Sequence, residues 1–264
     1  LKKADIKALA YYTLENYWGQ KESLNSYNEY KLLDSYTDKT DYGMWLSYTN
    51  SFFGNKITFG AEFKTGDVLG EEIYRTSSDY INYGSNMNIL GFFIQDELSF
   101  MNNKLHIIAG LRNDFVKFYD GFQIITDPTK VTGFSVSEST QLDGNNWNAL
   151  SPKLALHYKI GQNSNIYTSY SVGFVPPKLK DLSQTGKINK GFRLANPSLK
   201  PEYLTNYELG FSKTIANKFR LNTALYHSIG KDFQYLIGTG DSIDTGGQSL
   251  KPVLNSDNIA EISI

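Results

Sequence analysis

The sequence predicts an all-β protein, part of an antiparallel up-and-down transmembrane β-barrel. Three observations lead to this prediction: an excess of aromatic residues, a period-two alternation of apolar side chains, and short turns that alternate with long loops. The chain of 264 residues contains 19 Tyr, 16 Phe and 3 Trp. Tyr and Trp are most favourable where one end of the ring is apolar and the other hydrated, as at a membrane surface.

Apolar residues recur at every second position along many segments. From residue 105 the odd positions carry Leu105, Ile107, Ala109 and Leu111, whereas the even positions include Arg112. This period is typical of a strand with one apolar face. The alternation predicts ten strands, near residues 4–17, 42–53, 56–65, 86–100, 104–118, 150–160, 164–174, 201–213, 218–236 and 254–264.

The connections between these strands are of two lengths. Short polar turns are expected at residues 53–56, 101–104, 161–165 and 215–218, and long loops at about 66–86, 119–148, 175–200 and 238–252. Such alternation places all short turns at one end of the sheet, as in outer-membrane barrels with short periplasmic turns. A soluble sandwich predicts no such asymmetry.

One acidic residue interrupts the apolar pattern. Asp96 falls on the apolar face of the segment 86–100. A charge on a lipid-facing surface is least unfavourable near the membrane interface, so we expect Asp96 to lie close to the turn at 101–104.

Composition excludes several other classes of protein. The mean hydropathy of −0.39 and the lack of a long apolar run exclude a helical membrane protein. The absence of Cys excludes thiolate metal sites and thiol nucleophiles. The net charge is −1 with no basic stripe, so nucleic acid is not an expected partner. No signal peptide is visible at the start of the sequence.

Three groups of motifs follow one another along the chain. They are Phe93 to Leu98 with Ala109 to Asp114, Leu150 to Leu156 with Gly173 to Pro177, and Asn196 to Glu202 with Asn206 to Phe211. In this order and spacing they resemble the barrel of TonB-dependent receptors, whose N-P-x-L-x-P-E run is matched throughout. The resemblance covers about residues 86 to 264. The residues of this run themselves read as architecture, because prolines fix φ ahead of a strand.

The resemblance implies a barrel of about 22 strands with an N-terminal plug domain in its lumen. Residues 1–264 would then be a partial barrel of roughly ten strands, and we expect the plug domain and the C-terminal strands to lie outside this chain. The implied partners are outer-membrane lipid, a small-molecule or metal-chelate ligand, and the TonB complex of the inner membrane, reached through the missing N-terminal region. A surface lipoprotein is a further candidate partner.

Two sets of loop residues are candidates for binding the imported ligand. Arg193, Lys187 and Lys190 carry the positive charge that an anionic siderophore would meet. Aromatic rings that a ligand ring could stack on are those of Trp147, Tyr119 and Phe122. The alternative roles are those of solvated loop charges and of an aromatic girdle.

The sequence does not indicate catalysis, a cofactor or a metal site. His106 and His157 are expected to face the lumen near the short turns, and no His lies between Phe174 and Leu199, where haem receptors of the resembled family place one. Asp241 and Asp244 lie among glycines that include Gly246 and Gly247, but their spacing matches no EF-hand loop. A flexible loop tip is the simpler interpretation.

Three functional readings stay open at this point. The first is active import of a scarce ligand, with a ferric siderophore as the foremost candidate and cobalamin, an oligosaccharide or a peptide as others. The second is a small complete barrel enzyme, such as an outer-membrane protease, which requires acids and a His at the loop end. The third is a soluble β-rich binding module with Tyr-lined faces.

Overall fold

The chain folds into one long antiparallel sheet, which we call the wall, and one small sheet that we call the inner sheet. The computed structural model describes residues 4–24, 30–52, 54–188, 190–216, 218–244, 250–259 and 261–263. Among the described residues no helix has the length and apolar character needed to cross a membrane. The all-β, up-and-down prediction is confirmed, and the sheet stays open at both edges.

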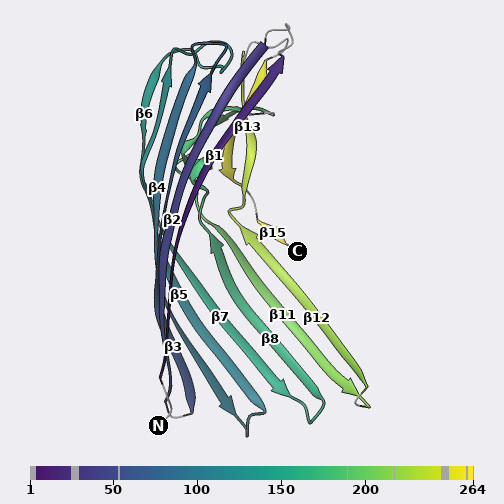
Figure 1. Cartoon of the computed structure of the whole chain (residues 1–264). Helices are drawn as coiled ribbons and strands as arrows, with labels where there is room; N and C mark the ends of the chain where they lie inside the picture. Colours follow the sequence, from purple (N-terminus) through teal and green to yellow (C-terminus); the bar gives the residue numbers. More distant parts are fainter. Residues whose placement is uncertain are drawn as a thin grey trace.

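The wall has eleven strands, and those that follow each other in sequence pair side by side. The strand order is β1-β2-β3-β4-β5-β7-β8-β11-β12-β15, and β6 pairs with the upper part of β5. Figure 1 shows the short turns at the lower end and the long connections at the upper end. The wall strands are β1 (Asp5–Leu24), β2 (Tyr30–Phe52), β3 (Asn55–Tyr74), β4 (Tyr80–Phe100), β5 (Leu105–Thr126), β6 (Glu138–Leu142), β7 (Asn145–Lys159), β8 (Ser164–Val175), β11 (Glu202–Ile215), β12 (Phe219–Lys231) and β15 (Ile262–Ser263).

The inner sheet lies beside the upper half of the wall (Figure 1). Its strand order is β13-β14-β10-β9, and the central pair β10 and β14 is parallel. These strands are β9 (Gly186–Ile188), β10 (Gly191–Leu194), β13 (Gln234–Ile243) and β14 (Lys251–Asn258), and the short helix α1 (Leu179–Ser183) precedes β9.

Several predicted loops are in fact strands. The expected loop at 66–86 is wrong, because β3 and β4 continue to a connection of residues 75–79. Tyr83 lies across Gly70 in this extension, where a Cβ on the glycine would collide with the ring. Polar residues continue the backbone ladder here because hydrogen bonds between strands do not depend on side-chain hydropathy. The loop expected at 119–148 likewise contains the end of β5, the whole of β6 and the start of β7.

The C-terminal third departs most from the predicted strands. The single strand expected at 218–236 is two strands in different sheets, since the chain leaves the wall at Asp232, where φ is 56°. Residues 251–258 form β14 of the inner sheet, so the barrel strand predicted at 254–264 is wrong except for the two residues of β15. The loop at 238–252 begins inside β13, and residues 245–249 lie outside the described residues. The loop at 175–200 contains α1, β9 and β10.

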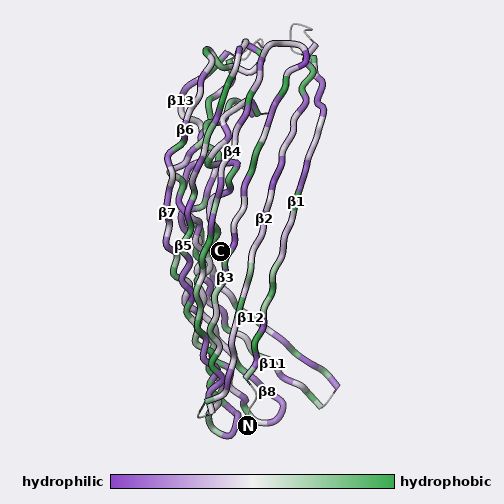
Figure 2. The backbone as a smooth tube through the Cα atoms, turned by 60° about the vertical axis from the view of Figure 1, so that its left-hand side comes forward, coloured by the Kyte–Doolittle hydropathy of each residue, from purple (hydrophilic) through white to green (hydrophobic). Residues whose placement is uncertain are grey.

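The two faces of the wall differ in chemistry along its lower half. Cross-strand rows on the outer face are mostly apolar, with Asp96, Asn113 and Asn148 as polar members. Figure 2 shows hydrophobic and hydrophilic residues alternating along the strands. One row joins Met44, Phe63, Leu90 and Phe115, and a polar row above it contains Thr65, Asn88, Lys117 and Asn146. We call the apolar rows below this polar row the outer band.

The outer band extends over about ten residues of each long strand, the length expected of a barrel strand in a bilayer. Asp96 lies within it near the turn at 101–104, as expected, and accepts a hydrogen bond from the Asn55 amide at 3.3 Å. That turn is tight, since Met101, Asn102 and Asn103 all have positive φ. The outer band therefore begins directly above the short turns.

The inner face of the lower wall carries charges. Arg112 donates to Asp114 at 2.7 Å and to Glu62 at 2.6 Å, and the group lies over Gly91. A Cβ at Gly91 would collide with both Arg112 and Asp114, so the glycine gives the ion pair its space. The wall is thus apolar outside and polar inside at the same height.

A hydrophobic cluster attaches the segment 176–200 to the inner face of the wall. Leu182 and Leu199 pack against Met87, Val116 and Phe118, and Leu199 is only 1% exposed. Burial of both leucines contributes to holding this segment against the wall.

We predict that Leu199→Ala in the intact protein lowers the free energy of unfolding by about 2 to 5 kcal/mol, because it leaves a cavity in this cluster. The control is Leu250→Ala, whose side chain is 63% exposed and should change stability by less than about 0.5 kcal/mol. Chemical unfolding followed by tryptophan fluorescence measures both. Equal effects of the two substitutions would contradict the packing role of Leu199.

Candidate functional site

The segment between β8 and β11 folds back onto the inner face of the wall and forms one side of a cavity. Ser183 of α1 is hydrogen-bonded to Ser85 of β4 at 3.1 Å, and the Gln123 amide donates to the Thr185 carbonyl at 2.9 Å. These bonds join α1 and the residues after it to the upper parts of β4 and β5.

The N-P-x-L-x-P-E run connects this segment to the inner sheet. The Asn196 amide donates to the Ser256 carbonyl of β14 at 2.9 Å, and its Oδ1 accepts from the Ser198 backbone at 3.1 Å. Asn258 accepts from the Lys200 backbone at 2.7 Å. The Asn196 side chain of the run therefore positions backbone, and the Lys200 backbone is held by a side chain of β14.

Arg193 of β10 forms hydrogen bonds to residues in and just after α1. Its guanidinium donates to Asp181 and to the Gln184 side chain, each at 2.8 Å, and to the Lys180 carbonyl at 3.3 Å. Its side chain is 11% exposed. A planar guanidinium presents five donors from three nitrogens in a fixed fork, whereas a lysine carries its three donors on one nitrogen. Arg193 thereby fixes α1 relative to β10.

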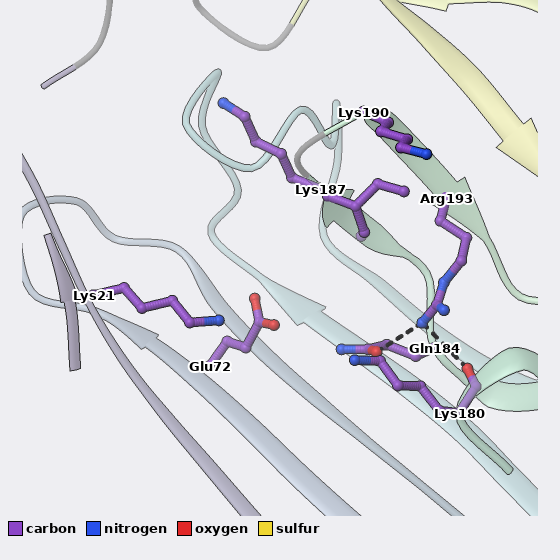
Figure 3. Close-up of a pocket in the computed structure, with 9 residues that line it drawn as sticks. Lys21, Glu72, Lys180, Gln184, Lys187, Lys190 and Arg193 are labelled. Carbon is purple, nitrogen blue, oxygen red and sulfur yellow. Dashed lines mark hydrogen bonds between the residues drawn. The ribbon is translucent and has the colours of Figure 1, made fainter. Parts of the chain in front are cut away.

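A cavity of about 400 Å³ lies between this segment and the wall. Figure 3 shows Lys21 and Glu72 on the wall side and Lys180, Gln184, Lys187, Lys190 and Arg193 on the other. The volume falls in the range of small-molecule pockets. Lining residues, as far as the chain is described, are Lys21, Glu72, Lys180, Gln184, Gly186, Lys187, Ile188, Lys190 and Arg193.

The lysines around the cavity are partly desolvated and lie near each other. Burial lowers the pKa of Lys180, and the nearby charges of Arg193 and Lys21 lower it further. Burial and Lys251 lower the pKa of Lys187 in the same way. Desolvation and like charge both disfavour the ammonium form, so the site holds more positive charge than its own acids neutralise.

Glu72 is the acidic member of the lining. Burial raises the pKa of its carboxyl above the ordinary value, although a hydrogen bond from Tyr74 at 3.3 Å and the charges of Lys21, Lys31 and Lys180 oppose this shift. A carboxylate in this position repels an anion and attracts a donor group.

The structure brings together three of the six candidate binding residues. Arg193, Lys187 and Lys190 all line the cavity, but Arg193 is occupied with Asp181 and Gln184. Lys21, Glu72 and Lys180 also line the cavity but are not among the residues predicted from the sequence. Lys180 lies directly before the Asp181 that binds Arg193, but the other two come from strands remote in sequence, and no local signal identifies them.

The three aromatic candidates lie elsewhere. Trp147 packs against the hydrophobic cluster around Phe118 on the inner face. Tyr119 donates to Asn88 at 3.2 Å, and the Lys117 ammonium lies 5.3 Å from its ring centroid. Phe122 lines a second cavity that also contains Asp67, Gly84 and Gln141.

The histidines form no metal centre among the residues that the structure describes. His106 and His157 pair across β5 and β7 near the short turns, with ring centroids 6.0 Å apart. Both ring nitrogens of His106 are engaged, with Ser99 and with the Asn103 carbonyl. In the candidate calcium loop Asp241 is hydrogen-bonded to Thr239, and Gly246 and Gly247 lie outside the described residues.

Comparison with known proteins gives one family match. A family model described as TonB dependent receptor-like, beta-barrel, matches residues 3–263, which extends the resemblance to the N-terminal strands. No curated protein matches the sequence significantly.

Solved structures show the same fold at low sequence identity. The ferric yersiniabactin uptake receptor FyuA of Yersinia pestis superposes with a TM-score of 0.70 at 13% identity over 98% of this chain and 36% of its own. The copper transporter OprC gives 0.64 at 13% identity over 95% and 38%, and the siderophore receptor PiuA of Acinetobacter baumannii 0.61 at 14% over 98% and 40%. This chain thus spans less than half the length of each.

We predict that Arg193→Lys loosens the folded segment, because the single nitrogen of lysine does not reproduce the fork that reaches Asp181, Gln184 and the Lys180 carbonyl from two nitrogens. Loss of a buried charged hydrogen bond should weaken local protection by about 1.5 to 3 kcal/mol. Hydrogen exchange of amides 179–196 measures this against those of β4. The control Arg75→Lys alters a pair remote from this segment, in which the Arg75 side chain is 49% exposed and its partner Asp34 is 7% exposed, and should change the protection of 179–196 by less than about 1 kcal/mol. Unchanged exchange in 179–196 would contradict the role of Arg193.

Proposed function

Since this chain belongs to the TonB-dependent receptor β-barrel family, we propose that it is part of an outer-membrane receptor that actively imports a scarce ligand, a ferric siderophore. The observation that carries the proposal is the wall itself, which combines an outer band of membrane thickness with a polar inner face and a cavity above the band. A receptor barrel needs this combination, because its outside contacts lipid and its inside contacts cargo.

The outer band supports a location in the outer membrane. Its side chains are exposed in this chain, including Phe92 at 50% and Ile94 at 53%. Apolar rows of this height are expected to face lipid, and the polar row above them to lie at the membrane surface. Both edges of the wall are open, and unpaired backbone groups cannot stay in hydrocarbon. We infer that further strands of the whole receptor pair with β1 and β12.

A metal chelate is the cargo that fits best. Of the similar proteins, one is named as a ferric yersiniabactin uptake receptor, one as a siderophore receptor and one as a copper transporter. These proteins are only 13 to 14% identical to this chain, so their names support the proposal only through the shared fold. The cationic lining of the cavity supports an anionic cargo independently.

Energy for import would come from the TonB complex of the inner membrane, through a plug domain that precedes this barrel region. A surface lipoprotein is a further candidate partner. Both proposals follow from the family and from the span of this chain, which is under half of the similar receptors.

The two alternative readings have less support. A barrel protease needs acids and a His at the loop end, whereas His106 and His157 lie at the end with the short turns. A soluble module would have to keep the outer band in water, where an exposed apolar patch of this extent favours aggregation.

Deletion of the full-length gene tests the transport proposal. Under iron limitation the deleted strain should lose growth on at least one ferric chelate from a panel of citrate, catecholate and hydroxamate complexes, and a plasmid copy should restore it. Import of the radiolabelled chelate should also stop when the proton-motive force is collapsed. Undiminished import of every chelate would rule the proposal out.

Lipid exposure of the outer band is tested by placing a charge within it. Ile94→Arg should lower the free energy of unfolding in lipid vesicles by about 2 to 4 kcal/mol, because Ile94 lies in the middle of the outer band. Asn146→Arg, on the same face in the polar row above, should lower it by about 1 kcal/mol or less. Urea titration of vesicle-folded receptor measures both values. Equal costs at the two positions would contradict a lipid-facing band.

A further inference from the structure

The cavity between the folded segment and the wall carries an unusual excess of positive charge. Of its lining residues in the described part of the chain, Lys21, Lys180, Lys187, Lys190 and Arg193 are cationic, and Glu72 is acidic. The wall strands contribute one cation and one acid, and the remaining cations come from the segment of residues 180–193.

The surroundings of the cavity add further positive charge. Lys31 of β2 lies 4.7 Å from the centroid of the Tyr74 ring, and burial followed by the charge of Lys187 lowers its pKa. Lys251 of β14 acts on Lys187 in the same manner. Cations are therefore gathered here from both sheets and from the segment between them.

Ordinary solvation does not explain this arrangement. A solvated surface lysine extends its ammonium into water and avoids other cations. At this cavity burial lowers the pKa of Lys31, Lys180 and Lys187, and other cations nearby add to the shift for each. Acids already present oppose part of these shifts, since Glu72 and Asp79 raise the pKa of Lys31, and Asp181 and Glu72 raise that of Lys180. Like charges held together in partly desolvated positions reduce stability, and an added anion would relieve this.

The roles within the lining differ. Arg193 is bonded to Asp181 and Gln184 and acts as a positioning residue. Its Nε is buried and has no hydrogen-bond partner among the described residues. Figure 3 shows Lys21 and Lys180 on opposite sides of Glu72, with Lys187 above them. Lys187 donates to the Val131 carbonyl at 3.5 Å, a long bond to a neutral acceptor. Lys21, Lys180 and Lys187 are the candidates for contact with a ligand because they line the cavity as cations.

We propose that this cavity binds a ligand with several carboxylate or phosphate groups, held by Lys21, Lys180 and Lys187, and that Glu72 limits how much negative charge the site accepts. The inference rests on the proposed import function, since we assign the site to the anionic metal chelate that the receptor carries. A cavity of about 400 Å³ accommodates a chelate of citrate size with its metal.

Equilibrium binding to the intact receptor in detergent tests the proposal. The probes are ferric citrate as a polycarboxylate chelate, inorganic pyrophosphate as a phosphate without a chelated metal, and an uncharged ferric hydroxamate chelate. Ferric citrate should bind most tightly, and its affinity should fall as salt is raised, because salt screens charge interactions.

Substitutions of the lysines and of Glu72 should change the affinity for ferric citrate in opposite directions. Lys180→Gln and Lys187→Gln should each weaken ferric citrate binding about tenfold, as expected for the loss of a charged hydrogen bond. Glu72→Gln should tighten it, by about threefold to tenfold, because a repelling carboxylate is removed. Lys117→Gln, on the outer face of β5, is the matched control and should leave binding unchanged. Tighter binding after removal of Glu72 is a result that a purely structural role would not produce.

Three outcomes would overturn the inference. Equal binding of the uncharged chelate, or an affinity unchanged by salt and by all cavity variants, would overturn the anion site itself. Binding of pyrophosphate without ferric citrate would overturn its assignment to a metal chelate and point to a phosphate source such as a lipid headgroup. If a lysine variant fails to fold, Glu72→Gln decides alone, since it keeps the shape of the side chain. Growth and import assays distinguish the anion-binding proposal from the transport proposal. Import without anion binding would reject only anion binding by the cavity, and anion binding without import would reject only the transport function.

Discussion

Backbone pairing between long neighbouring strands is the interaction on which the rest of the structure depends. β2 to β5 pair with neighbours on both sides over most of their length. A backbone N–H or C=O that is shielded from water, by protein or by lipid, is unfavourable without a hydrogen-bond partner. The ladder must therefore be continuous before either face of the wall can contact lipid or form a binding site. The ladder also explains why polar sequence above the outer band stays in strands.

Pairing in register aligns side chains of one kind across the wall. Because successive residues point to opposite faces, each row of neighbours presents the same chemistry to the same side. The row of Met44, Phe63, Leu90 and Phe115 is outside, whereas Arg112, Asp114 and Glu62 are inside, with Gly91 providing room for the guanidinium. A single strand thereby serves a membrane and a polar interior at once.

The cavity arises from a different kind of contact. The segment 176–200 is attached to the inner face by Leu182 and Leu199 and closed by Arg193, and the inner sheet adds β14 beside β10 through the Asn196 amide. Packing, a buried ion pair and a parallel strand pair thus place Lys180 and Lys187 opposite Lys21 and Glu72. The N-P-x-L-x-P-E run acts here as a structural support for a site whose chemistry lies in other residues.

The sequence by itself determined the wall, because the period-two pattern and the unequal connections are local signals that each strand carries in its own residues. It also placed Asp96 near a short turn and selected Arg193, Lys187 and Lys190, whose charges are visible without coordinates. Only the tertiary structure decided that β13 and β14 leave the wall, that Trp147 packs inside while Tyr119 lies elsewhere, and that Lys21 and Glu72 complete the cavity. The physical reason is separation along the chain: these contacts join segments that are not neighbours in sequence, and their energy depends on burial and charge that exist only after the strands have paired.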